Sequence, residues 1–76
     1  MITLELIRTQ LIEAIKQSGL SQTELAKKLG IKQPTVFDYL HGKSMPALDT
    51  FANLCEVLDL DANEILCIRR NTDNII

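Results

Sequence analysis

The sequence predicts an all-α domain built from about five helices. Apolar residues recur at spacings of three and four through most of the chain, and glycines or other turn residues separate these stretches. No segment shows the alternation of apolar and polar residues that is typical of a strand. The chain has 76 residues, of which 46% are hydrophobic, so it is large enough for one core. We therefore expect a single compact bundle with short connections.

Glycines and a capping motif delimit the first two helices. Residues 4–18 predict the first helix, and Gly19 ends it. Its apolar face contains Leu4, Ile7, Leu11, Ile12, Ala14 and Ile15. Ser21 and Glu24 then have the spacing of a capping box, in which each side chain binds the other residue's backbone N–H. The second helix therefore begins after Ser21, and Gly30 ends it.

The third helix is expected over about residues 33–40. Pro34 fits only the first turn of a helix, where no backbone N–H is needed, and Gly42 provides the end. Residues 43–46 form a loop. The first two thirds of the chain thus predict three helices joined by short turns.

A fourth and a fifth helix complete the bundle. The fourth has an apolar face and ends at Asp59; this face contains Leu48, Phe51, Ala52, Leu54, Cys55 and Leu58. Asp61 and Glu64 have the spacing of a second capping box. This motif predicts a last short helix that contains Ile65 and Leu66.

Residues 21–41 predict a helix-turn-helix, because two helices of about eight residues flank a short turn that contains glycine. Val36, together with Tyr39 or Leu40, must point inward to anchor the second helix. The remaining side chains of this helix point outward, namely Gln33, Pro34, Thr35, Phe37, Asp38 and His41. An outward Phe beside amide and hydroxyl groups indicates a contact surface.

The charge is unevenly distributed. The whole chain has a net charge of −2, but residues 21–48 carry a net charge of +2 and residues 49–76 a net charge of −4. Residues 1–20 are neutral. The positive charge therefore accompanies the helix-turn-helix.

Several function classes are excluded at this stage. No apolar run is long enough to span a bilayer, and the first residues form neither a secretory nor a transit peptide, so we expect a cytoplasmic protein with no membrane contact. Cys55, Cys67 and the single histidine, His41, lack metal-ligand spacing, so we expect no metal and no cofactor. The same residues offer no convincing nucleophile and base, so we expect no enzyme. The cysteines are interpreted as small buried residues on helices, with a disulfide as the alternative.

Residues 20–66 resemble the phage repressor and Cro-type helix-turn-helix domain, the lambda-repressor-like family. The resemblance rests on SQxELAxxLG, on QPTV, on GK, on the loop that contains Pro46, and on DxxEIL. It implies a five-helix bundle, with a DNA-binding domain over residues 1–68 and a C-terminal tail over residues 69–76. The implied function is a sequence-specific transcription regulator, a repressor, that binds an inverted repeat in double-stranded DNA as a homodimer.

The resemblance also implies roles for individual residues. Its recognition helix lies in the major groove, and the implied base contacts are Gln33, Pro34, Thr35, Phe37 and Asp38. The implied phosphate contacts are Gln22, Thr23, Lys32, His41, Lys43 and Ser44. The amide of Gln33 matches N6 and N7 of adenine, and Gln22 stands at a helix start, where phosphate binds. The alternatives are a merely solvated Gln22 and a Phe37 that belongs to the core.

Two further expectations concern packing and partners. Some relatives bury an arginine against a glutamate where this chain has Ile15 and Leu40, so an apolar pair is expected there, which avoids the desolvation cost of a buried ion pair. The candidate dimer surfaces are the last helix with the tail, and the pair Ile2 and Leu6. The alternative function is an antitoxin or adaptor that also binds a protein partner through the acidic, apolar C-terminal end.

Overall fold

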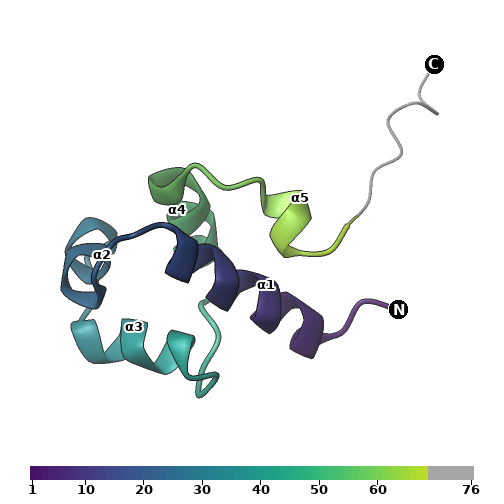
Figure 1. Cartoon of the computed structure of the whole chain (residues 1–76), viewed down its shortest axis with the longest axis horizontal. Helices are drawn as coiled ribbons and strands as arrows, with labels where there is room; N and C mark the ends of the chain where they lie inside the picture. The colour runs from purple at the N-terminus through teal and green to yellow at the C-terminus, as the bar shows by residue number, and fades with distance from the viewer. Residues whose placement is uncertain (69–76) are drawn as a thin grey trace.

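The computed structural model describes residues 1–68, which form five helices and no strand (Figure 1). The helices are α1 (Leu4–Gln17), α2 (Gln22–Leu29), α3 (Gln33–Leu40), α4 (Leu48–Leu58) and α5 (Ala62–Ile65). In Figure 1, α1 crosses the middle of the molecule, with α3 on one side and α4 and α5 on the other. The all-α prediction is confirmed, and the expected bounds agree within one residue; Leu66 is the C-cap of α5. The predicted tail lies outside the described residues.

The capping box predicted for α2 is present. The side chain of Ser21 accepts a hydrogen bond from the Glu24 N–H at 3.1 Å, and the Glu24 carboxylate accepts one from the Ser21 N–H at 2.9 Å. The hydrogen bond from the Ser21 backbone N–H, and after it the Ser21 side chain, lower the pKa of Glu24 because they favour the charged carboxylate. At the other end, Gly30 adopts a left-handed conformation with φ 70°. Local side chains thus fix both ends of α2.

The second predicted capping box does not form. The Asp61 carboxylate instead accepts a hydrogen bond from the Asn63 N–H at 3.0 Å, and the Glu64 N–H donates to the Asp61 carbonyl oxygen at 3.0 Å. A hydrogen bond that an aspartate carboxylate accepts from the amide two residues later forms an Asx turn, which competes with the capping box for the same oxygen. The prediction of a reciprocal pair at Glu64 was therefore wrong, although Asp61 is the N-cap.

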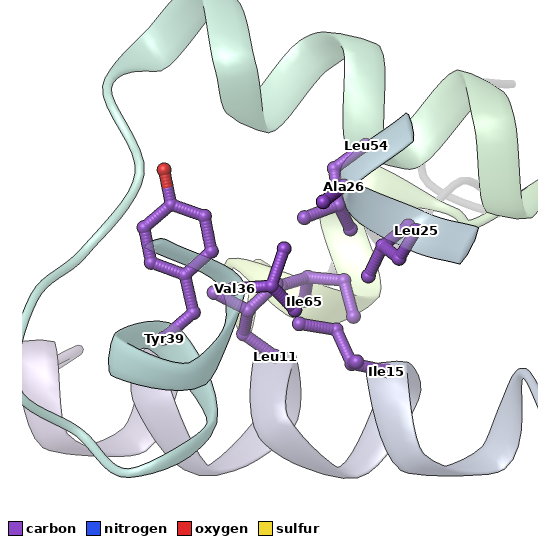
Figure 2. Packing of buried hydrophobic residues seen from close by; sticks show 8 residues of the cluster. All are labelled: Leu11, Ile15, Leu25, Ala26, Val36, Tyr39, Leu54 and Ile65. Carbon is purple, nitrogen blue, oxygen red and sulfur yellow. The ribbon is translucent and has the colours of Figure 1, made fainter. Parts of the chain in front are cut away.

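The core is one cluster to which all five helices contribute (Figure 2). Its buried members are Leu11, Ile15, Leu25, Ala26, Val36, Tyr39, Leu54 and Ile65. Val36, Leu25 and Leu54 have no exposed surface. Tyr39 is buried and Leu40, half-buried, also packs against the cluster, so both candidate anchors of α3 are used. Ile15 and Leu40 are both part of this apolar packing, as expected.

Four residues differ from their expected burial, and one of them is Ala52 of α4, which is exposed. Leu4 and Leu48 are 57% and 84% exposed, because each is the first residue of its helix and lies at the edge of the core. Cys55 is buried on α4, but Cys67 is half-buried and lies after α5, in a left-handed conformation with φ 63°. Both cysteines are free thiols. None of the helices formed by residues 1–68 is long and apolar enough to cross a membrane.

The Ser21→Ala variant should be less stable than the wild type by about 1 kcal/mol at neutral pH, because the Glu24 N–H loses its cap. Urea unfolding followed by circular dichroism measures this, and Ser44→Ala, an exposed loop serine, is the control. The lowered pKa of Glu24 adds a pH dependence: its stabilisation is present above the unfolded pKa and is lost as the pH falls through the folded pKa. Equal midpoints for the two variants would contradict the capping role.

Candidate nucleic-acid interface

The first turns of α2 and α3 meet through two glutamines. The side-chain amide of Gln33 donates a hydrogen bond to the side-chain oxygen of Gln22, eleven residues earlier. Gln22 is half-buried and Gln33 is exposed. A glutamine amide has two N–H groups and one oxygen, so Gln33 keeps one donor and its acceptor for a ligand. The two residues singled out in the sequence therefore form one unit, in which Gln22 orients Gln33.

The outer face of α3 contains the predicted base contacts. Gln33, Pro34 and Phe37 are exposed, whereas Thr35 and Asp38 are half-buried. Val36 and Tyr39 point the other way, into the core. The helical period thus separates α3 into an anchored face and a free face, with Thr35 and Asp38 at the borders.

An aromatic cluster, which consists of Phe37, His41 and Lys43, covers the C-terminal end of α3. The rings of Phe37 and His41 stack with centroids 3.9 Å apart and an interplanar angle of 22°. The Nδ1 atom of His41 lies 2.9 Å from the Phe37 carbonyl oxygen, and the Lys43 ammonium lies 5.5 Å from the Phe37 ring centroid. Phe37 is 37% exposed, so the alternative that it belongs to the core is wrong.

The predicted phosphate contacts surround α3 at both ends. At one end, Lys32 is the N-cap of α3, and Thr23 lies in the first turn of α2. The capping box uses the amide of Glu24, so the backbone N–H groups of Gln22 and Thr23 remain to bind an anion. At the other end, His41, Lys43 and Ser44 are exposed. The arrangement suits a polyanion that passes along the first turn of α2 and beyond the end of α3.

One residue beside this surface was not predicted from the sequence. Arg8 of α1 reaches the end of α3, where its Cδ atom lies 3.2 Å from the point at which a Cβ on Gly42 would stand. The available signal was its spacing, because position 8 continues the stripe formed by Leu4, Leu11 and Ile15. A cation in the apolar stripe of a helix indicates a specific role.

The cysteines and acidic groups offer little reactive chemistry. Among residues 1–68, no group of three or more His, Cys, Asp or Glu side chains is arranged to hold a metal ion. Burial raises the pKa of the Cys55 thiol, and the Asp61 charge adds to this shift, so the reactive thiolate is disfavoured.

Comparison with known proteins gives a consistent family. Residues 11–65 match the family model described as helix-turn-helix. Two relatives are called antitoxin HipB, from Escherichia coli O6:H1 strain CFT073 and from Escherichia coli strain K12. Each is 39% identical over 67 residues, an alignment that covers 83% of this chain and 69% and 74% of the relatives, respectively. No solved structure matches at comparable significance.

The Phe37→Leu variant should change the environment of His41 while leaving the fold intact. Removal of the stacked ring abolishes its shielding, so the ring protons of His41 should move downfield in the proton NMR spectrum. Because Phe37 is partly exposed, the free energy of unfolding should change by less than about 1 kcal/mol. Unmoved His41 signals would contradict the stacking, and Thr35→Ser is the control on the same helix.

Proposed function

The chain belongs to the helix-turn-helix family, and we propose that it is a sequence-specific transcription regulator that binds double-stranded DNA through α3. The observation that carries this proposal is the pairing of Gln22 with Gln33 at the start of a helix whose opposite face is anchored in the core. A ligand then meets an oriented amide on a fixed helix. We also propose that the chain acts in the cytoplasm and catalyses no reaction.

In the proposed complex, α3 lies in the major groove with its N-terminal end at the base edges. The free N–H and the oxygen of the Gln33 amide match N7 and N6 of adenine, respectively. Gln22 accepts the hydrogen bond that orients this amide. Together with the first backbone N–H groups of α2, Gln22 also binds a phosphate. The aromatic cluster supplies the ring of Phe37 to a thymine methyl group and the charge of Lys43 to the backbone.

The charge distribution supports one orientation on DNA. Residues 21–48 carry a net charge of +2, whereas α4, α5 and the segment between them contain Asp49, Glu56, Asp59, Asp61 and Glu64. Figure 1 places α4 and α5 on the side of α1 opposite to α3. Phosphate attracts the α3 side and repels the other. Because few cations are present, non-specific affinity should be weak.

We further propose that the chain acts as a homodimer and as a repressor. One recognition helix of eight residues contacts only a few base pairs, and two copies on half-sites one helical turn apart multiply the specificity. Exposed apolar side chains suited to such a contact are Ile2, Leu4 and Leu6 near the N-terminus and Ile68 after α5. An inverted-repeat operator would reflect the two-fold symmetry of this dimer.

A second candidate function is that of an antitoxin, which binds a toxin protein as well as DNA. The name antitoxin, which both HipB relatives carry, favours it. The test is co-purification of the tagged chain with the product of the adjacent gene, with and without DNase treatment. A complex that survives DNase supports the antitoxin function, and the lack of any complex contradicts it.

Selection of bound sequences from a random DNA pool tests the main proposal, and the expected result is an enriched inverted repeat. Gln33→Ala should then lose about 1–3 kcal/mol of discrimination at one base pair of each half-site. Gln22→Ala, measured alone and together with Gln33→Ala, should show coupling, because Gln22 orients the amide. No enrichment overturns the proposal, and unchanged selectivity in Gln33→Ala removes this residue from the base contacts.

The effect of Asp38→Asn separates two roles for the carboxylate on α3. If the carboxylate only repels the phosphates, the variant should bind all DNA sequences more tightly, and we expect this result because few nearby cations offset its charge. If it accepts a hydrogen bond from cytosine N4, preference should instead change at one base pair. Titrations on the selected site and on scrambled DNA, at two salt concentrations, distinguish the outcomes, with Glu13→Gln on α1 as the matched control.

A further inference from the structure

We propose that Arg8 of α1 is a positioning residue for DNA binding, which fixes the C-terminal end of α3 and thereby the aromatic cluster of Phe37, His41 and Lys43. The inference rests on the proposed DNA-binding function and adds to it a residue outside the helix-turn-helix. Arg8 lies on the stripe of α1 that contains Leu11 and Ile15, both of which are buried. A cation at such a position is costly unless its surroundings use the charge.

The stem of Arg8 packs directly on Gly42. A Cβ built on Gly42 would stand 3.2 Å from Cδ and 3.6 Å from Nε of Arg8, so the missing side chain provides the space that Arg8 occupies. Gly42 also has φ 71°, a conformation that other residues rarely adopt. The backbone conformation thus favours glycine, and a Cβ at this position would press on the side chain of Arg8.

The end of α3 is where a cation is useful. The last turn of α3 contains no basic residue, and its carbonyl groups give this end a partial negative charge. The chain closes with hydrogen bonds from the Gly42 N–H to the Tyr39 carbonyl at 3.3 Å and from the Lys43 N–H to the Asp38 carbonyl at 2.9 Å. Arg8, whose Nε lies 3.6 Å from the position of a Cβ on Gly42, brings a positive charge from α1 to this end of α3.

The guanidinium of Arg8 is held in place rather than free in solvent. Its Nη1 atom lies 3.0 Å from the Glu5 carboxylate, one turn earlier on α1, and the side chain is 25% exposed. Its Nε atom is buried and has no hydrogen-bond partner among the described residues. An exposed ion pair is weak by itself, so packing against Gly42 and the charge at the helix end carry the interaction.

A single peptide bond links Gly42, against which Arg8 packs, to Lys43 of the proposed DNA-binding surface. Lys43 follows Gly42 directly, and its ammonium lies over the Phe37 ring that stacks on His41. A displacement of Gly42 therefore changes the direction in which Lys43 leaves the helix and the contact of Lys43 with Phe37. In this arrangement Arg8 influences the surface that faces the phosphates without touching DNA.

The test compares Arg8→Met, which removes the charge and keeps an apolar stem, with Arg8→Lys, which keeps both. Without DNA, Arg8→Met should shift the amide NMR signals of Lys43 and the ring signals of His41, and Arg8→Lys should largely restore them. On the selected DNA site, Arg8→Met should lower affinity about tenfold, an effect of the size expected for one lost contact. Because Arg8 acts through Lys43, Arg8→Met should reduce the salt slope by no more than Lys43→Ala does, about one, and the double variant should bind like Lys43→Ala alone.

Each other outcome overturns the proposal. Wild-type affinity in Arg8→Met denies Arg8 any role, and a double variant whose salt slope is about one lower than that of Lys43→Ala makes Arg8 a phosphate contact instead. Lower affinity without shifted Lys43 and His41 signals shows an effect elsewhere. If Arg8→Met does not fold, Arg8→Gln replaces it under the same criteria, and thermal melting confirms that each variant is folded. If the wild type itself binds no DNA, the proposed function fails, while the NMR comparison still decides whether Arg8 fixes the end of α3.

Discussion

The burial of Val36 is the interaction on which the rest of this molecule depends. α3 has only eight residues, a length at which an isolated helix is unstable in water, so it exists because the core holds it. Val36 has no exposed surface and lies among side chains of α1, α2 and α5, with Tyr39 one turn later on the same face (Figure 2). Everything presented on the outer face is oriented by this inner one. The core behind α3 therefore holds the backbone of the candidate interface in place.

The ends of α2 and α3 are stabilised in different ways. α2 is capped by its own side chains, through Ser21 and Glu24. α3 has no side-chain cap at its N-terminal end and no basic residue in its last turn. Instead, Gln22 of α2 accepts a hydrogen bond from Gln33 in the first turn of α3, and Arg8 of α1 packs against Gly42 just after the last turn. The helix with the exposed functional face thus receives its support from the two helices that pack against it.

Local features were predictable from the sequence, and contacts between distant residues were not. Helix bounds and the cap at Ser21 depend on residues that are close together in the sequence, so their spacing predicts them. The capping box predicted at Asp61 was wrong because two local motifs compete for the same carboxylate oxygen, and only the backbone conformation decides between them. The outward face of α3 followed from its period. The joining of Gln22 to Gln33, the stacking of Phe37 on His41 and the approach of Arg8 to Gly42 depend on how helices cross and on side-chain rotamers, which periodicity does not encode.

The aromatic cluster has a consequence for the entropy of association. A side chain that is immobilised on binding costs about 0.5–1.5 kcal/mol of rotamer freedom. Phe37, His41 and Lys43 already restrain one another in the free protein through the stacked rings, the bond from the histidine ring to the helix backbone and the ammonium over the Phe37 ring. Part of that freedom is therefore lost when the chain folds, where the large apolar core compensates for it. The surface that remains for a ligand is preorganised, and less entropy is left to lose at the encounter.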